Sequence, residues 1–278
     1  MKHLIKYTAS LLVLSLFFSC SKYINKLPLD QFTDPAYWSS EDNVRSFCWG
    51  FYNDLFSGYG NGQGFGTFYF TSFSDDQDNP DFEDFPKNAP ASDGNWGFGD
   101  IRKANLVLSR ADMVPMDDEA KNHWKGVARF FRAFNYFLLV KRFGDVQWYS
   151  AVLDVSDTAL YKPRDPRNVV MDSVLSDLDF AVDNLRTKAV EDGIDPNTTT
   201  NTVNKDVALA LKARICLYEG TYSEYRENDK ARAAKYLKEA KDAAKQIINS
   251  GYVLNKDFRS VYNSEDLGGN SEIILYKE

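Results

Sequence analysis

Histidine is scarce in this sequence, which has only His3 and His123 among its 278 residues. A Ser-His-Asp triad needs a histidine as its base, and zinc is most often held by histidine and cysteine side chains. His3 lies in an N-terminal segment that we expect to be removed, and no G-x-S-x-G motif accompanies His123. Because His123 stands beside Trp124 at the start of an expected helix, we predict an exposed or capping imidazole. The shortage of histidine therefore argues against a triad hydrolase and a zinc enzyme.

Cysteine is also rare, and the three thiols are those of Cys20, Cys48 and Cys216. Cys48 and Cys216 fall on the apolar faces of expected helices, isolated from other metal ligands in the sequence. Both are predicted to be buried free thiols, and a disulfide between them stays open because it depends on distances. No metal site is expected from these residues, and we predict that the protein is not an enzyme.

Basic residues and long apolar runs are in short supply as well. Lys and Arg number 33 against 40 Asp and Glu, which gives a formal net charge of -7. Phosphate binding depends on clustered Lys and Arg, so a nucleic-acid partner is not expected, whereas neutral ligands such as sugars stay open. The apolar run LLVLSLFF at residues 11–18 is much shorter than the roughly 20 residues of a transmembrane helix.

The N-terminus has the pattern of a secretory signal followed by a lipid attachment site. Lys2 and Lys6 precede the apolar run, which is followed directly by Ser19 and Cys20. A cysteine in this place is typical of a lipobox, where signal peptidase II cleaves and the thiol of Cys20 receives lipid. Acyl chains would then anchor the protein without a transmembrane helix. The predicted organisation is a lipoprotein signal peptide over residues 1–19, a lipidated tether over 20–38 and a helical domain over 39–278.

Aromatic residues, by contrast, are abundant. They make up 15% of the chain, with 20 Phe, 16 Tyr and 5 Trp, while the hydrophobic fraction of 44% and the charged fraction of 26% are ordinary for a globular protein. An aromatic excess usually indicates large packing surfaces and less often a platform for binding sugars or proteins.

Helical periodicity runs through most of the remaining chain. Ser39 or Ser40 is predicted to cap the first helix, Asp165 and Pro166 to be the N-cap and first residue of a middle one, and Asp229 to cap the last. The expected apolar faces are Val44, Phe47, Phe51 and Leu55; Ile101, Ala104, Leu108 and Ala111; Trp124, Val127, Phe131, Phe134 and Leu138; Val170, Val174, Leu178, Ala181 and Leu185; Val207, Leu211, Ile215 and Tyr218; and Ala233, Leu237, Ala240, Ala244 and Ile247.

These helices follow one another largely in pairs joined by turns, and the last is rich in alanine, where a partner helix would approach closely. The pattern is typical of tetratricopeptide-like helical hairpins, although no clean repeat of the consensus is visible. The predicted fold is therefore mainly α, an α-helical scaffold that carries long loops.

The longest expected loop is rich in aromatic, Gly and Asp residues. Its glycines at residues 58–66 (GYGNGQGFG) do not have the G-x-G-x-x-G spacing of a dinucleotide site. The acidic stretch at residues 75–84 (DDQDNPDFED) could hold Ca²⁺, but Pro80 and Lys87 break both possible EF-hand registers. We expect a solvated acidic loop, with a calcium-bound or partner-facing loop as the alternative, and no cofactor.

Four segments, in order along the chain, resemble the SusD/RagB family. Residues 126–146 (GVARFFRAFNYFLLVKRFGDV) are similar to its arginine-alanine helix and Phe-Gly-Asp-Val turn, with Gln147 where the family usually has Pro. The other three are Trp96 with Ile101, Ala104 and Asn105; Pro163 and Arg164 with Val170, Asp177, Leu178, Ala181 and Leu185; and residues 208–225 (ALALKARICLYEGTYSEY), which resemble a helix and aromatic turn.

The resemblance implies a tetratricopeptide-like, non-catalytic lipoprotein of the outer membrane, lipid-anchored and surface-exposed. Such a protein captures starch-like nutrient oligosaccharides or polysaccharides and delivers them to a SusC-type TonB-dependent β-barrel transporter. The family usually has roughly twice this domain-sized length. This chain ends soon after residues 271–275, an expected strand, so we interpret it as the N-terminal part of a longer protein without its C-terminal half.

Trp96, Tyr69, Phe73 and Asn95 are the candidate ligand-binding residues, because sugars stack on aromatic rings and hydrogen-bond to amides. The resemblance supports Trp96 in particular. Packing is the alternative for each aromatic residue, and the Trp96 ring could instead lie buried against the helix that contains Phe131.

Two alternatives to glycan capture stay open, together with one residue role. The protein could be a structural lid or adaptor of the transporter with little ligand affinity of its own. It could also be a glycoside hydrolase, which needs two carboxylates, but the 40 acidic residues give no means of choosing a pair. Asn105, near an apolar face, is predicted to tie down a loop backbone rather than to touch a ligand.

Overall fold

A computed structural model describes residues 34–55, 94–194, 201–264 and 266–276. The chain divides into the units Met1–Ser39 and Ser40–Glu278. In the first unit the described part contains helix α3 (Asp34–Tyr37), where the Asp34 carboxylate accepts a hydrogen bond of 2.9 Å from the Trp38 indole. The predicted signal peptide and Cys20 lie outside the described residues, so both stay predictions.

The second unit is built from helices. They are α4 (Glu41–Trp49), α5 (Gly99–Arg110), α6 (Asp118–Phe143), α7 (Arg167–Asn184), α8 (Lys188–Ile194), α9 (Lys205–Tyr225), α10 (Lys230–Asn249) and α11 (Phe258–Tyr262), with 3-10 turns η1 (Tyr52–Asp54), η3 (Ala111–Met113) and η4 (Thr158–Tyr161). The described residues contain no strand, and an isolated bridge joins Val146 to Asp165. The prediction of a mainly α fold is confirmed.

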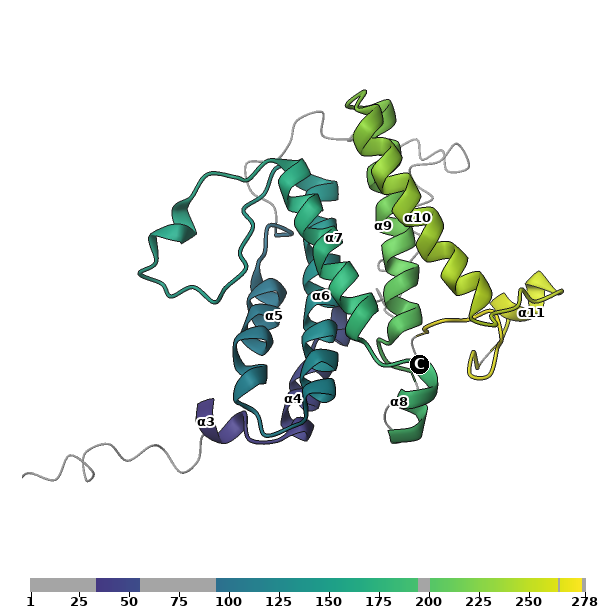
Figure 1. The fold of residues 1–278 in the computed structure, drawn as a ribbon, viewed down its shortest axis with the longest axis horizontal. Coiled ribbons are helices and arrows are strands. Elements are labelled where there is room, and N and C mark those ends of the chain that lie inside the picture. The colour runs from purple at the N-terminus through teal and green to yellow at the C-terminus, as the bar shows by residue number, and fades with distance from the viewer. Residues whose placement is uncertain (1–33, 56–93, 195–200, 265, 277–278) are drawn as a thin grey trace, which may run out of the picture. The chain divides into compact units, whose positions relative to one another are not determined.

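Neighbouring helices pack in chain order. In Figure 1, α5, α6, α7, α9 and α10 follow one another from left to right, and α6 contacts α5 and α7 while α9 contacts α7 and α10. The α6/α7 and α9/α10 pairs have the most extensive contacts, and each pair is joined by a connection that leaves its helices side by side. The fold is thus a row in which α5, α6, α7, α9 and α10 each pack against the next helix of the row.

The predicted N-cap residue is confirmed for two of the three helices whose N-terminus was predicted. The Ser40 hydroxyl accepts from the Asn43 amide at the start of α4, and Asp229 accepts from the Arg232 amide at the start of α10. The prediction at α7 was wrong by one residue, because Pro166 occupies the N-cap and has no side chain to accept a hydrogen bond.

The cap of α7 comes instead from another part of the chain. The carboxylate of Asp145, just after α6, accepts a 2.8 Å hydrogen bond from the Arg167 amide. Asp165 is used elsewhere, because it accepts from the Trp148 amide at 2.7 Å and pairs with Lys162 at 2.6 Å. Both carboxylates therefore join the segment that follows α6 to the approach to α7.

The predicted apolar faces are largely buried, with informative exceptions. All five residues of the α7 face are buried. Leu138 in α6 and Leu237 in α10 are exposed by 40% and 37%, whereas Tyr136 and Tyr236 are fully buried. Contacts with both α5 and α7 bury a wide part of α6 and leave Leu138 outside, so a single predicted stripe could not describe that helix.

Residues 271–275 do not form the expected strand. Most of them lie in turns and bends, and the Ile273 amide donates to the Asn270 carbonyl within a turn at 3.1 Å. The Val253 amide donates to the Ser271 carbonyl at 3.0 Å. A second hydrogen bond runs from the Ser271 hydroxyl to the Val253 carbonyl at 3.1 Å. One such pairing is too short for a ladder, so this prediction was wrong for the described residues.

A buried ion pair joins α6 to α7 and α5. Arg132 donates from Nε and Nη2 to the two oxygens of Asp177, both at 2.7 Å, and from Nη1 to Asn105 Oδ1 at 2.6 Å. All three residues are buried. The bidentate geometry satisfies two charges that would each be costly to bury alone.

We predict that Arg132→Leu lowers the free energy of unfolding by about 3–5 kcal/mol, because Asp177 would stay buried without its two strongest hydrogen bonds. Arg129, at 3.7 Å from Asp177, is too distant to replace them. The matched change Lys238→Gln breaks a surface pair with Asp242 and should leave stability close to that of the wild type. Urea unfolding followed by circular dichroism measures both, and an equal effect of the two changes would contradict the prediction.

The α9/α10 pair depends on a glycine at its closest approach. A Cβ added at Gly220 would lie 2.7 Å from Leu237 Cγ and 3.0 Å from the Leu237 backbone nitrogen. Gly193 in α8 has nothing within 4 Å of the same position. The two residues can therefore be compared directly, because packing requires a glycine at position 220 but leaves room for a side chain at position 193.

Gly220→Ala should lower the free energy of unfolding by about 1–3 kcal/mol through overpacking. Gly193→Ala should instead raise it, by up to about 1 kcal/mol, because alanine favours the helix. The double variant Gly220→Ala with Leu237→Ala should recover part of the loss, since it removes the contacting side chain. Thermal unfolding of the variants gives the comparison, and stabilisation by Gly220→Ala alone would show that the helices can separate without cost.

Candidate functional site

A cavity of about 360 Å³ lies where α5 begins, and we call it the Trp96 cleft. Aromatic and aliphatic side chains make up most of its lining, with a few polar ones between them. The lining residues are Trp96, Phe98, Gly99, Ile101, Arg102, Asn105, Gln147, Tyr149, Ala151, Leu153 and Leu160.

The Trp96 ring is half-buried and serves both the packing and the cleft. It lies edge-to-face on Phe143 of α6, with ring centres 4.9 Å apart, and on Phe98 at 5.7 Å. The Arg164 guanidinium lies 4.6 Å from its ring centre. Both roles weighed for Trp96 are therefore partly present, since it packs against the α6 helix through Phe143 and also lines a cavity.

Hydrogen bonds fix the wall of the cleft that contains Tyr149 and Ala151. Asn105 donates to the carbonyls of Tyr149 and Ala151 at 2.9 and 3.1 Å, which confirms that it ties down a loop backbone. The buried Tyr136 hydroxyl accepts from the Tyr149 amide, and burial raises the pKa of Tyr136. Arg132 in turn holds the Asn105 oxygen. The position of the Tyr149 segment is thus fixed by side chains of α5 and α6.

The cleft combines flat apolar faces with hydrogen-bonding groups. The rings of Trp96, Phe98 and Tyr149 supply the apolar surface. Gln147 donates to the Lys162 carbonyl at 3.2 Å, whereas its Oε1 atom is buried without a hydrogen-bond partner in the described structure. No carboxylate occurs among the described residues that line the cleft. Rings with scattered polar groups suit a sugar, whose C–H faces stack while its hydroxyls form hydrogen bonds.

The other predicted binding residues are not all placed. Asn95 is exposed in a turn directly before Trp96 and is not one of the lining residues. Tyr69, Phe73 and the acidic stretch at residues 75–84 that was considered for Ca²⁺ lie outside the described residues. Sequence reasoning missed Tyr149 and Gln147, whose shared signal was their place directly after the Phe-Gly-Asp-Val turn.

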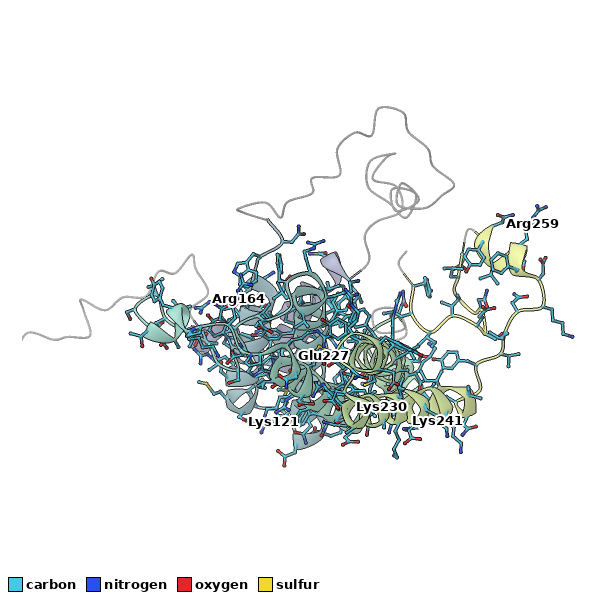
Figure 2. The ribbon with its side chains drawn as sticks, turned by 90° about the horizontal axis from the view of Figure 1, so that it is seen from above. Lys121, Arg164, Glu227, Lys230, Lys241 and Arg259 are labelled. Carbon is cyan, nitrogen blue, oxygen red and sulfur yellow. The ribbon has the colours of Figure 1, made fainter. Side chains whose placement is uncertain are left out.

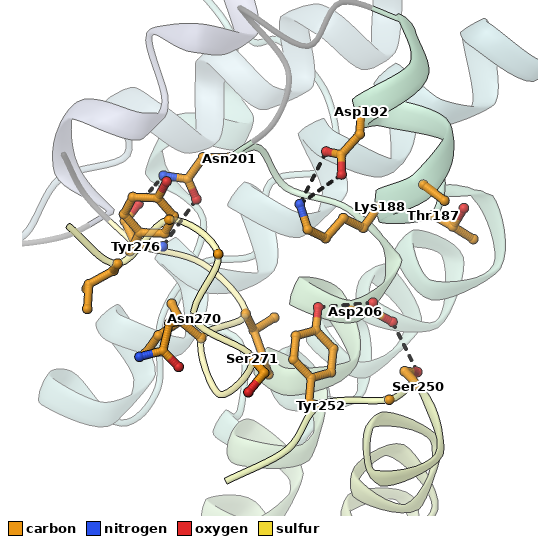
Figure 3. A pocket seen from close by; sticks show the side chains of 17 residues that line it. Thr187, Lys188, Asp192, Asn201, Asp206, Ser250, Tyr252, Asn270, Ser271 and Tyr276 are labelled. Atoms are coloured by element: carbon orange, nitrogen blue, oxygen red, sulfur yellow. Dashed lines mark hydrogen bonds and ion pairs between the residues drawn. The ribbon is translucent and has the colours of Figure 1, made fainter. Parts of the chain in front are cut away.

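A second cavity, of about 870 Å³, lies between the starts of α8 and α9, the end of α10 and residues 267–276 (Figure 3). Asp206 accepts from the Tyr252 hydroxyl at 3.2 Å, and burial together with Asp206 raises the pKa of Tyr252 to about 12. The Asn201 amide pairs with the backbone of Tyr276. We favour the Trp96 cleft because three aromatic rings line it and because Asn105 and Tyr136 tie its loop wall to α5 and α6.

His123 was predicted to be exposed or to act as a cap, and the prediction that it is exposed was wrong. The imidazole is buried, and its Nδ1 accepts the Arg186 amide at 3.2 Å just beyond α7. Burial and the nearby Arg186 charge lower the pKa of His123 to about 3, so it is a neutral acceptor at ordinary pH. The packing of the turn after α7 against α6 is the cause, and the sequence around His123 does not show it.

Other reactive groups have structural surroundings. Cys48 and Cys216 are buried free thiols, as predicted, and burial raises the pKa of Cys216 to about 12. Glu191 lies 3.4 Å from His123, but neither lines the two cavities above. Among the residues that the structure describes, no three His, Cys, Asp or Glu side chains are grouped to hold a metal ion. None of the described helices has both the length and the apolar character to cross a bilayer.

Comparisons with known proteins point to one family. A family model described as SusD-like, starch-binding associating with outer membrane, matches residues 68–217, more than half of the chain. SusD-like protein P38 of Formosa agariphila is 27% identical over 218 residues, and SusD-like protein P2 of the same organism is 26% identical over 179. These matches cover 73% and 62% of this chain but only 40% and 30% of the relatives.

Solved structures show the same fold. A SusD-like protein from Bacteroides fragilis aligns over 90% of this chain and 47% of its own, with a TM-score of 0.62 and 23% identity. A SusD-like carbohydrate binding protein from the same organism aligns over 81% of this chain and 44% of its own, with a TM-score of 0.59 and 18% identity. The chain thus spans less than half the length of the proteins it resembles.

The wall of the cleft gives a direct test. Asn105→Ala should lower the free energy of unfolding by about 1–3 kcal/mol, because it leaves two carbonyls and an arginine donor without their partner. Amide hydrogen exchange in residues 149–153 should also become faster. The matched change Asn135→Ala removes an amide that donates to the Phe131 carbonyl within α6 and should leave exchange in that segment unchanged. Unaltered exchange in Asn105→Ala would show that other contacts position the wall.

Proposed function

The chain belongs to the SusD-like family, described as starch-binding and associating with the outer membrane, and we propose that it captures glycans through the Trp96 cleft. The observation that carries this proposal is the cleft itself. Half-buried Trp96 and the ring of Tyr149 offer flat surfaces, and Gln147 and Arg102 offer hydrogen-bonding groups between them. The buried contacts of Asn105 fix the wall in advance, which lowers the entropic cost of binding.

We further propose that the captured glycan is delivered to a SusC-type TonB-dependent β-barrel transporter. The family description places its members at the outer membrane, and the signal pattern before Cys20 supports a lipid anchor there. Surface exposure, the lipidated tether and the transporter partnership all belong to this proposal. The length of the mature protein is also part of this proposal, because the matched relatives are more than twice as long as the segment that aligns with this chain.

The structural lid or adaptor is the main rival function. It would keep the transporter contact but have no measurable glycan affinity. A glycoside hydrolase has less support, because two carboxylates must flank the scissile bond and the described lining of the Trp96 cleft offers none. Calorimetric titration with oligosaccharides separates capture from the lid function, and reducing-sugar release detects hydrolysis.

Replacing Trp96 tests the proposed site. Trp96→Ala should weaken binding of a maltooligosaccharide or another bound glycan by about 1–3 kcal/mol, the scale of one aromatic anchor. The loss in stability should be smaller than the roughly 3–5 kcal/mol of a fully buried ring, because Trp96 is half-buried.

The matched control is Trp49→Ala, which removes a tryptophan that is 40% exposed at the end of α4 and outside the cleft. Titration calorimetry and melting temperature should be measured on the full chain. Glycan affinity that is unchanged in the folded Trp96→Ala protein would remove this residue from the site. The absence of binding to any glycan would favour the lid function.

A further inference from the structure

We propose that the Trp96 cleft selects glycans that carry negative charge, as a carboxylate or a sulfate ester, over neutral glycans. The proposal rests on the proposed function, since it names the class of glycan that the same cleft would capture. Its basis is the distribution of charge around the aromatic surface.

Two arginines adjoin the cleft without a carboxylate partner among the described residues. Arg102 lines the cleft, is exposed, and donates from Nη1 to the Leu153 carbonyl. Arg164, labelled in Figure 2, is exposed and has its guanidinium against the Trp96 ring. Neither forms an ion pair with a described acidic residue, in contrast to Arg132, Arg167, Arg186 and Arg232.

The acidic residues nearest to these arginines in the sequence have other partners. Asp100, beside Arg102 in chain order, pairs with Lys103 at 2.7 Å. Asp165, beside Arg164, pairs with Lys162 at 2.6 Å and accepts the Trp148 amide. The described lining itself has no carboxylate. No described carboxylate lies within ion-pair distance of either guanidinium, although the charge of Asp165 reaches Tyr149 in the cleft lining and the whole chain is acidic.

Both guanidiniums are held in place and still have donors to spare. A guanidinium has five N–H donors, and Arg102 uses one on Leu153. Stacking on Trp96 leaves the edge of the Arg164 guanidinium available. Carboxylates and sulfates accept pairs of hydrogen bonds from such an edge, and charge-assisted hydrogen bonds are about twice as strong as neutral ones. A sugar stacked in the cleft could thus place an anionic substituent near either arginine.

The start of α5 adds to the same field. Gly99, the first residue of α5, lines the cleft. The side chain of the N-cap residue Phe98 has no atom that could accept a hydrogen bond from the first amides of the helix. The amides of a first helical turn and the helix dipole both favour negative charge, and Asp100 in the first turn of α5 supplies part of it. Nothing lies within 4 Å of the position that a Cβ of Gly99 would take, so the backbone there is accessible.

The test compares three oligosaccharides of equal length, one neutral (a maltooligosaccharide), one composed of uronates and one sulfated, titrated into the full chain by calorimetry. At least one anionic ligand should bind about tenfold or more tightly than the neutral one at low salt. That advantage should shrink as NaCl is raised, because salt screens the attraction between exposed charges, with a Debye length of about 8 Å at physiological ionic strength. The ligand that gains identifies the carboxylate or the sulfate as the recognised group.

Arg102→Gln and Arg164→Gln should each reduce affinity for the preferred anionic glycan by about ten- to a hundredfold, the range for one charge-assisted hydrogen bond, and affect the neutral glycan much less. Arg214→Gln, an exposed arginine of α9 outside the cleft, is the matched control. Equal affinities for charged and neutral glycans, or equal losses for both in the arginine variants, would overturn the charge selectivity and leave glycan capture intact. Failure of all three glycans to bind would overturn both proposals.

Discussion

One buried ion pair, Arg132–Asp177, fixes the relative positions of α5, α6 and α7. One guanidinium joins α6 to α7 through two hydrogen bonds of 2.7 Å and to α5 through Asn105. It also lies 5.1 Å from the ring centre of Trp148. Because all of this is buried, any displacement of one helix would leave a charge without a partner in a medium of low dielectric. The relative positions of three helices are thereby coupled.

The same ion pair also positions the candidate site, through Asn105. Asn105, held by Arg132, fixes the carbonyls of Tyr149 and Ala151, and these residues form one wall of the Trp96 cleft. The other wall rests on Phe143 near the end of α6. A binding surface built on helix ends and tied loops needs little rearrangement to accept a rigid ligand such as a sugar ring. The stability of the core and the shape of the cleft are therefore parts of one arrangement.

Features that depend on nearby residues were predictable. Ser40 and Asp229 cap helices because a side-chain oxygen reaches an amide three residues later, and such spacing is visible in the sequence. The α7 face follows from helical spacing and is buried as expected. The family resemblance was confirmed, and with it came Trp96 as a candidate. Its half-buried position between Phe143 and Arg164 could not be read from spacing.

Periodicity and capping act over a few residues, so the helical class, the starts of α4 and α10 and the family resemblance could be predicted from the sequence. The tertiary structure decided what lies between distant segments. Asp145 caps α7 from 22 residues away, His123 is buried by the turn at Arg186, and Tyr149 faces the cleft because Asn105 holds it from 44 residues away. Contacts of this kind depend on how helices pack, and no local pattern of residue types records which distant partner a side chain meets.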